Sequence, residues 1–221
     1  MQTFTTPAPI TAHLTLPAGR IQIIAADRTD TTVDIRPANP TKNRDVTSAQ
    51  QTTATYTDGV LRIHTPQPKN TVLSSAGAVE ITVQLPADSH VRATTAACEL
   101  RGVGRLGQVT FEGAYNHTKI DEAAALTLTA TQGDTVVGRL NGDATITAQS
   151  GDITIAEAAA GTLNLSTQSG DINVTAAAGA SATLDSHVGY GRIDNSLKND
   201  GTPTLHIHAT TTHGNITARS L

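Results

Sequence analysis

QGDTVVGRLNGDATITAQSGDITIAEAAAGTLNLSTQSGDINV, residues 132–174, repeats one short pattern. A glycine followed by Asp or Thr returns every nine or ten residues, and a segment of alternating apolar and polar residues follows it. Glycine accepts the positive φ of a tight corner, and Asp can hydrogen-bond the backbone of its own turn. Alternation with a period of two is typical of a strand with one buried face. The corners are expected at Gly133-Asp134, Gly142-Asp143, Gly151-Asp152, Gly161-Thr162 and Gly170-Asp171.

Strands of this length need partners, because a half-buried strand of about five residues is not stable alone. Stacked units solve the problem, since each covers the apolar face and the backbone edge of the next. Two units would form a coil of roughly 18–20 residues that rises about 4.8 Å, the spacing between strands. The Ser-Gly-Asp pattern at 150–152 and 169–171 favours two units per coil, and three units stay the alternative. We therefore predict an all-β protein containing a right-handed β-solenoid.

The same rhythm extends more weakly over the rest of the chain. We expect the solenoid to span residues 93–221, with further corners at Gly107 and Asn116 and a closing coil formed by residues 204–218. Residues 10–90 read as antiparallel strands, with a loop over 66–77. We expect residues 1–92 to form an N-terminal antiparallel β lobe or cap, because an open solenoid end exposes unpaired strand edges.

Composition supports a thin core. Hydrophobic residues are 38% of the 221 residues and aromatic residues 2%, with no Trp. The net charge is -4, and no run of Lys or Arg provides the footprint of a nucleic-acid-binding protein. The single Cys98 excludes an intramolecular disulfide, and we expect it to be a small buried apolar residue.

The N-terminus, MQTFTTPAPITAHLTLPAG, lacks the cationic start and the apolar run of a signal peptide. No apolar stretch approaches the length that crosses a bilayer. We expect a soluble, cytoplasmic protein, and export by a route that needs no cleaved signal stays open.

Several segments resemble the bacterial putative-adhesin domain family. They are Phe4 to Ile10 with Leu16-Pro17-Ala18-Gly19, the strand and corner from Glu80 to Pro86, the serial Ser-Gly-Asp-Ile units, and the closing segment from Ala182 to Leu197. The resemblance covers nearly the whole chain and implies a β-solenoid domain of unknown function. The family offers no catalytic residue to carry over, and a fold does not fix a function.

The stacked aspartates form the sharpest candidate site. With two units per coil, Asp134, Asp152 and Asp171 lie along one edge and Asp143 and Thr162 along the other. Calcium binds several carboxylate and carbonyl oxygens, and glycine-rich nine-residue repeats can bind it. Those repeats carry more glycines than the one per unit found here, so turn capping is the main interpretation and calcium binding the weaker one.

His206 and His208 share one face of a strand, and His213 follows nearby. Two imidazoles and a third ligand could hold zinc, but no carboxylate or Cys completes a recognisable spacing. We therefore expect exposed histidines and no cofactor.

Two enzymatic interpretations have little support in the residues. Glycoside hydrolysis requires paired carboxylates on one face and commonly uses aromatic platforms, yet Phe4, Tyr56, Phe111, Tyr115 and Tyr190 are the only aromatic residues. The run from Gly102 to Gly107 reads Gly-Xaa-Gly-Xaa-Xaa-Gly, but no helix pattern follows it, as a dinucleotide site requires. We interpret these residues as turn glycines.

We therefore predict a non-enzymatic, adhesin-like binding or scaffold protein that presents a flat, Thr-rich solenoid face. The expected partner is an unknown protein or polymer, with no nucleic acid and no membrane span, and self-assembly through stacked ends is a variant. A carbohydrate-active enzyme on a β-helix is the alternative.

Overall fold

The computed structural model describes residues 1–66, 76–115 and 117–221. The chain forms two compact units, Met1–Tyr115 and Asn116–Leu221. Most of the expected loop over 66–77, and the expected corner at Asn116, lie outside the described residues. The expected division into domains 1–92 and 93–221 stays a prediction.

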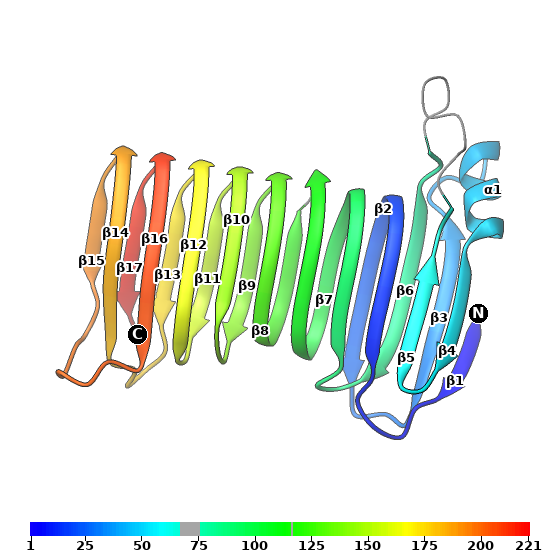
Figure 1. Cartoon of the computed structure of the whole chain (residues 1–221), viewed down its shortest axis with the longest axis horizontal. Coiled ribbons are helices and arrows are strands. Elements are labelled where there is room, and N and C mark those ends of the chain that lie inside the picture. Colours follow the sequence, from blue (N-terminus) through cyan, green and yellow to red (C-terminus); the bar gives the residue numbers. More distant parts are fainter. Residues whose placement is uncertain (67–75, 116) are drawn as a thin grey trace. The chain divides into compact units, whose positions relative to one another are not determined.

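The second unit is built from ten strands that stack in parallel (Figure 1). One sheet contains the second half of β8, then β10, β12, β16 and β14. The other contains the first half of β8, then β9, β11, β13, β17 and β15. The strands are β8 (Thr118–Gln132), β9 (Thr135–Leu140), β10 (Ala144–Ser150), β11 (Ile153–Ala158), β12 (Gly161–Ser169), β13 (Ile172–Ala176), β14 (Ala182–Tyr190), β15 (Ile193–Ser196), β16 (Leu205–His213) and β17 (Ile216–Ser220).

Successive coils are offset by 18 or 19 residues, with one strand in each sheet. The prediction of two units per coil is therefore confirmed. Identical positions stack across the sheet: Leu128 lies beside Ile146, and Ile146 beside Leu165. These side chains are buried, so the core consists of thin aliphatic layers, as the shortage of aromatic residues indicated.

The last two strands of the chain lie inside the stack. Leu163 on β12 pairs with Ile207 on β16, and Ile207 pairs with Leu184 on β14. Figure 1 shows β16 between β12 and β14. The prediction that residues 204–218 close the stack is therefore wrong, because the coil β14–β15 forms the end. The end coil carries Ser186 and Asn195 where the inserted coil has the buried Ala209 and Ala218, but a local pattern of alternation does not say which coil is the neighbour of which.

The first unit combines parallel and antiparallel pairs. Its elements are β1 (Gln2–Thr5), β2 (Thr11–Ala26), β3 (Asp30–Pro37), α1 (Asn43–Gln51), β4 (Thr53–Thr57), β5 (Val60–His64), β6 (Val79–Pro86) and β7 (His90–Tyr115). β3 pairs with β1 and β6, and β4 with β5, in antiparallel fashion. β2 pairs in parallel with β5, β6 and β7.

The expected antiparallel lobe is therefore only partly correct. Residues 17–19 were expected to end a strand, but β2 continues through them and Gly19 has φ +135°. The chain changes direction at this corner as it does in the second unit, so the two halves of β2 form one solenoid coil. The coil formed by β2 lies between β5 and β6 on one side and β7 on the other. Its neighbours in the stack are therefore not set by the order of the chain, as is also the case for the coil formed by β16 and β17.

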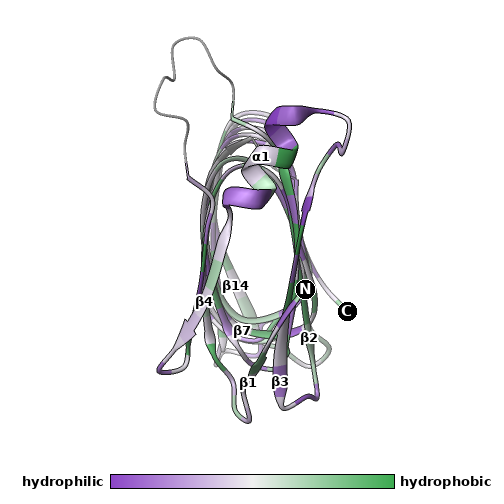
Figure 2. Ribbon diagram, turned by 90° about the vertical axis from the view of Figure 1, so that its right-hand side faces the viewer, coloured by the Kyte–Doolittle hydropathy of each residue, from purple (hydrophilic) through white to green (hydrophobic). Residues whose placement is uncertain are grey.

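The helix α1 packs against β3 and β6. It is mostly hydrophilic (Figure 2), and the carboxylate of its buried Asp45 accepts a hydrogen bond of 3.0 Å from the backbone N–H of Ala78. Among the described residues, no helix is both long and apolar enough to span a bilayer.

Candidate functional site

The stacked aspartates expected from the sequence are present, and we call Asp134, Asp152 and Asp171 the aspartate ladder. Their carboxylate oxygens accept hydrogen bonds that join neighbouring coils. The backbone N–H of Asp152 donates to Oδ1 of Asp134 at 3.0 Å, and that of Asp171 donates to Oδ1 of Asp152 at 2.8 Å. The inserted coil continues the ladder, because the backbone N–H of Asn215 donates to Oδ1 of Asp171 at 2.7 Å. Asn215 in turn accepts the N–H of Arg192 at 3.0 Å.

The opposite edge follows the same rule, since the N–H of Thr162 donates to Oδ1 of Asp143 at 2.8 Å. Each of these carboxylates therefore accepts a backbone donor of the next coil, which is a structural use of the side chain. Among the described residues, no three His, Cys, Asp or Glu side chains gather closely enough to hold a metal ion. Calcium binding by Asp134, Asp152 and Asp171 stays a prediction.

The three C-terminal histidines have separate neighbours. His206 Nδ1 lies 3.1 Å from the Thr183 hydroxyl, and His208 Nδ1 lies 3.3 Å from Oδ2 of Asp185. His213 stacks on Tyr190 with ring centroids 5.2 Å apart. Each imidazole therefore contacts a different residue of β14, and the described structure does not bring the three together.

Cys98 is buried within β7, as expected. Burial raises the pKa of its thiol to about 12, although a hydrogen bond with Thr95 opposes this rise. A thiol with so high a pKa forms no thiolate at neutral pH, so Cys98 lacks the property required of a nucleophile.

The glycine run from Gly102 to Gly107 lies within the long strand β7, as Gly19 lies within β2, and Gly104 has φ +80°, so the interpretation of turn glycines is confirmed for Gly104. A Cβ atom at Gly104 would come within 2.1 Å of the carbonyl oxygen of Ala25. Gly104 therefore allows two backbones to approach, and no helix N-terminus follows it for a dinucleotide phosphate.

The described grooves are shallow and lie on outer faces. One of about 340 Å³ is lined by Asp34, Arg36, Glu80 and neighbours on β3 and β6. Its Asp34 carboxylate is paired with Arg36 at 2.7 Å. Elsewhere, hydrogen bonds from Arg28 and Arg105 lower the pKa of Asp30 and Asp88, the opposite of the shift that a general acid requires.

A flat face of polar residues covers one sheet of the second unit. Outward positions of β8, β10, β12, β16 and β14 line up in two rows. We call these rows the threonine face; it consists of Thr127, Thr145, Asn164, His208 and Asp185 in one row and Thr129, Thr147, Ser166, Thr210 and His187 in the other. Nearly all of these residues are exposed, while the alternate residues of the same strands are mostly buried.

A second surface, in the first unit, escaped the sequence interpretation. His13 on β2 pairs in register with Arg62 on β5 and with Arg92 on β7. We call these three residues the basic row. They come together from distant parts of the chain, so only the register of the strands could have revealed them.

Comparison with known proteins now bears on the fold. The sequence model of one family, Toastrack DUF4097, matches residues 13–219. The chain belongs to the Toastrack DUF4097 family. The resemblance to the putative-adhesin family is thereby confirmed, and the β-solenoid class with it.

Two solved structures are similar to this Toastrack chain. A structure titled as a putative adhesin from Bacteroides fragilis is 15% identical, with a TM-score of 0.55, and the match covers 98% of this chain and 95% of the other. A putative cell adhesion protein from Clostridium sporogenes is 12% identical, with a TM-score of 0.44, and covers 100% of this chain and 98% of the other. At these identities the likeness concerns the fold alone. The search among curated proteins found no match.

Proposed function

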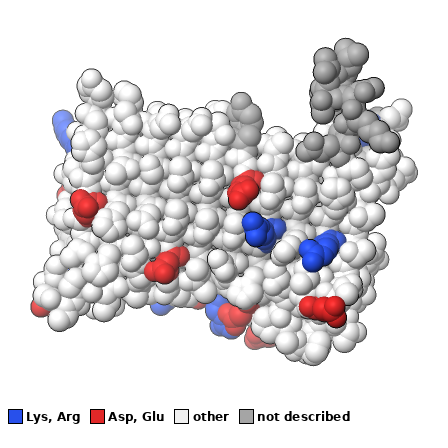
Figure 3. Space-filling model, in the orientation of Figure 1, with Lys and Arg blue, Asp and Glu red and all other residues white. Residues whose placement is uncertain are grey.

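We propose that this Toastrack protein is a non-enzymatic, adhesin-like binding protein that presents its threonine face to a polymer or protein partner. The observation that carries the proposal is the regularity of this face. Hydroxyl, amide and imidazole groups repeat at the strand spacing of about 4.8 Å along the stack, and no Lys or Arg lies among them. Figure 3 shows how sparse charged side chains are on the visible face of the molecule.

Such a face suits an extended partner with repeating polar groups. Hydroxyl groups both donate and accept hydrogen bonds, and a rigid sheet holds them in place before binding, which lowers the entropic cost of association. Titles of structural neighbours name adhesins, and this supports a binding role without indicating the partner.

The test is binding of the purified chain to immobilised bacterial polysaccharides and envelope proteins. Thr129→Arg/Thr147→Arg places two bulky cations on the threonine face and should abolish binding. The matched control Thr53→Arg/Thr57→Arg places the same groups on exposed positions of β4 in the first unit and should bind as the native chain does. Equal loss in both variants, or no binding by the native chain, would contradict the proposal.

Self-association through the stack end is a second candidate that one observation favours. β14 and β15 are each paired on one side only among the described strands. Tyr190 and Ile193 in this coil are 74% and 47% exposed. Sedimentation velocity over a hundredfold range of concentration would reveal the association, and Ile193→Lys should abolish it; a native chain that stays monomeric throughout would exclude it.

A further inference from the structure

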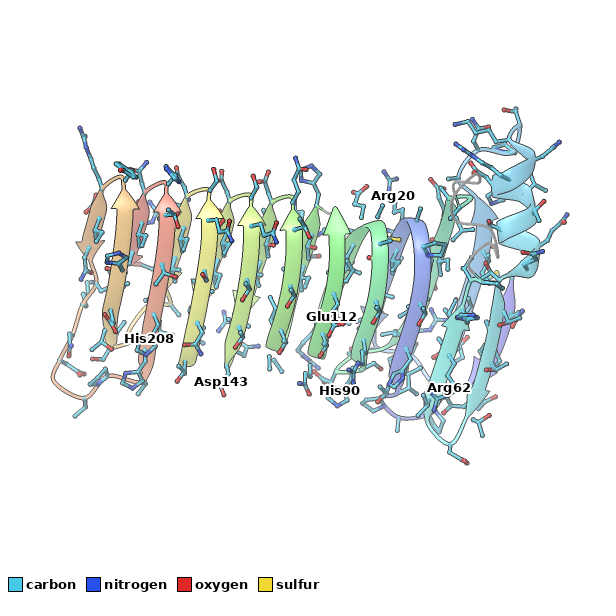
Figure 4. All side chains as sticks on the ribbon, turned by 45° about the horizontal axis from the view of Figure 1, so that its top comes forward. Arg20, Arg62, His90, Glu112, Asp143 and His208 are labelled. Atoms are coloured by element: carbon cyan, nitrogen blue, oxygen red, sulfur yellow. The ribbon has the colours of Figure 1, made fainter. Side chains whose placement is uncertain are left out.

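Three basic side chains lie next to one another on the outer surface of the first unit. Arg62, His13 and Arg92 occupy matching positions on the adjacent parallel strands β5, β2 and β7. Adjacent strands are about 4.8 Å apart, so the three groups stand within about 10 Å along one row. Figure 4 labels Arg62 on β5 and His90 on β7, the strands that flank β2.

Five other arginines of the unit each have a carboxylate close by, in contrast to Arg62 and Arg92. Arg20, Arg28, Arg36, Arg44 and Arg105 each lie within 4 Å of a carboxylate. Within the described parts of the chain, Arg62 and Arg92 have no such partner. The contact made by Arg62 is with His13, at 3.3 Å between Nη1 and Nδ1.

The two arginines place positive charge on either side of His13. Each lies opposite this imidazole on a neighbouring strand, and a cation opposite a protonated histidine would destabilise the sheet. Burial, and after it the charges of Arg62 and Arg92, lower the pKa of His13. The aspartate ladder is also a row of like charges, but its oxygens accept backbone N–H groups of the next coil. The basic row joins β5 and β2 through the contact between Arg62 and His13, and this contact leaves the guanidinium charge without a carboxylate among the described residues.

A shallow groove of about 250 Å³ adjoins the row and adds neutral donors. His13 and Arg92 line it together with Thr11, His90, Gln108 and Thr110. The backbone N–H of Gln108 donates to Nδ1 of His90 at 2.9 Å. That contact leaves the proton of the neutral ring on Nε2, so His90 retains a donor.

We propose that Arg62, His13 and Arg92 bind a tetrahedral oxyanion, a phosphate or sulfate group, on the outer face of the first unit. The planar fork of a guanidinium matches two oxygens of such a group, and the two arginines approach it from either side of His13. This site lies in the other unit from the threonine face, so its existence does not depend on the function proposed above.

Binding should be coupled to the protonation of His13. The charged groups that neighbour His13 are Arg62 and Arg92, and the titratable His90 lines the same groove. Burial first, and then the two guanidinium charges, disfavour the charged form of His13. A bound dianion reverses this effect and raises the pKa of His13, so binding takes up a proton. Affinity therefore increases as the pH falls through the range between the raised pKa of His13 in the complex and its lowered pKa in the free protein. Sulfate stays dianionic over this range, so the change reports on the protein.

The test uses NMR signals of the His13 imidazole, assigned with His13→Gln, in the full chain. Sodium sulfate is titrated at constant ionic strength, with sodium chloride as the balancing salt. We expect a saturable shift that is stronger at pH 5.5 than at pH 7.5. Arg62→Gln/Arg92→Gln should weaken binding by about fivefold or more, equivalent to about 1 kcal/mol. Arg20→Gln/Arg36→Gln removes the same charge from paired arginines and should leave the affinity unchanged.

Equal weakening in both double variants would overturn the proposal, because general electrostatics would then explain the binding. A shift that does not saturate would overturn it too. Arg62→Lys/Arg92→Lys keeps the charge and should still weaken binding through loss of the fork, which protects the test if the glutamine variant folds poorly. Inorganic phosphate at pH 7.5 forms the second arm: saturable binding of either anion supports the site, their ratio identifies the preferred group, and binding of neither overturns it.

Discussion

Gly151 lies at a corner of the solenoid where both the backbone conformation and the space around it require glycine. Its φ of +135° is a conformation that β-branched residues do not adopt without strain. A Cβ atom there would also lie 2.2 Å from the carbonyl oxygen of Gly133 in the preceding coil. Gly179 has a comparable φ of +81°, but nothing lies within 4 Å of its added Cβ. The two glycines therefore separate backbone strain from close approach.

Gly151→Val should lower the free energy of unfolding by about 3 kcal/mol or more, whereas Gly179→Val should cost only about 1–2 kcal/mol through backbone strain. Urea denaturation of the two variants beside the native chain measures both values. Similar losses in the two variants would mean that the coils can separate at Gly151 and that close approach contributes little.

Because Cys98 is buried, the free energy of unfolding should depend on pH in the alkaline range. Its pKa is about 12 in the folded chain and near 9.0 when unfolded, so between these values only the folded state keeps the proton. The unfolded state binds fewer protons there, and stability falls as the pH rises, by up to about 1.4 kcal/mol per pH unit. Cys98→Ala removes this contribution. The stability gap between native chain and variant, measured in urea at pH 8, 9 and 10, should therefore narrow above pH 9; a constant gap would contradict the burial of the thiol.

At the scale of elements, the ladder explains why Asp follows the corner glycine. Its side chain is used as an acceptor for the next coil, and the negative charge is incidental, because Asn215 occupies the same place in the inserted coil and accepts the N–H of Arg192. Each rung joins two coils at the corner, between the backbone hydrogen bonds that residues such as Gly151 and Ile153 donate to the next coil.

Asp152→Asn should therefore retain the native stability, since the amide oxygen replaces Oδ1, while Asp152→Ala should cost about 1 kcal/mol. Thermal unfolding followed by circular dichroism would compare the pair. If both variants lost the same stability, the charge and not the acceptor would be the essential property of the position.

The same geometry predicts the response to calcium. Because the ladder oxygens already accept backbone donors, the melting temperature should be the same in millimolar calcium and in chelator. A ligand that binds the native state raises the melting temperature by linkage, so an increase of several degrees would contradict this expectation and make the ladder a cation site.

Much of the element scale could be predicted from the sequence. The spacing of Gly151 and Gly170 determines the coil length, and alternation in strands such as β10 determines which residues are buried. The basic row could not be predicted, because His13 and Arg92 meet only through the register of β2 with β7. The threonine face could be predicted, because the alternation of apolar and polar residues identifies which side chains point outward.

For the whole molecule, the order of coils is the feature that sequence reasoning missed. Residues 205–220 separate β12 and β13 from β14 and β15, and β2 likewise lies between β5 or β6 and β7. Local pattern specifies the shape of a coil and says nothing of which coil is its neighbour. The order depends on connections such as residues 197–204, whose length allows the chain to run from β15 in the end coil back to the position of β16, between β12 and β14.

The inserted coil predicts which of two alanine substitutions, one in β16 and one in β14, lowers the free energy of unfolding more. Ile207→Ala, in the last coil of the chain, should cost about 2–5 kcal/mol, because its side chain is buried between two coils. Leu184→Ala, earlier in the chain but in the end coil, should cost about 1 kcal/mol, since this side chain is only partly buried. Chemical denaturation decides the ranking, and the reverse order would contradict the inserted coil.

The inserted coil also has a consequence for synthesis on the ribosome. A solenoid whose coils follow the order of the chain can grow by adding each new coil to the last as it emerges. Here β14 and β15 are made before their neighbours β16 and β17, so they must wait beside the growing stack with their edges unpaired. The second unit therefore completes its pairing only after β16 and β17 have left the ribosome and entered the stack, where β16 pairs with β12 and β14.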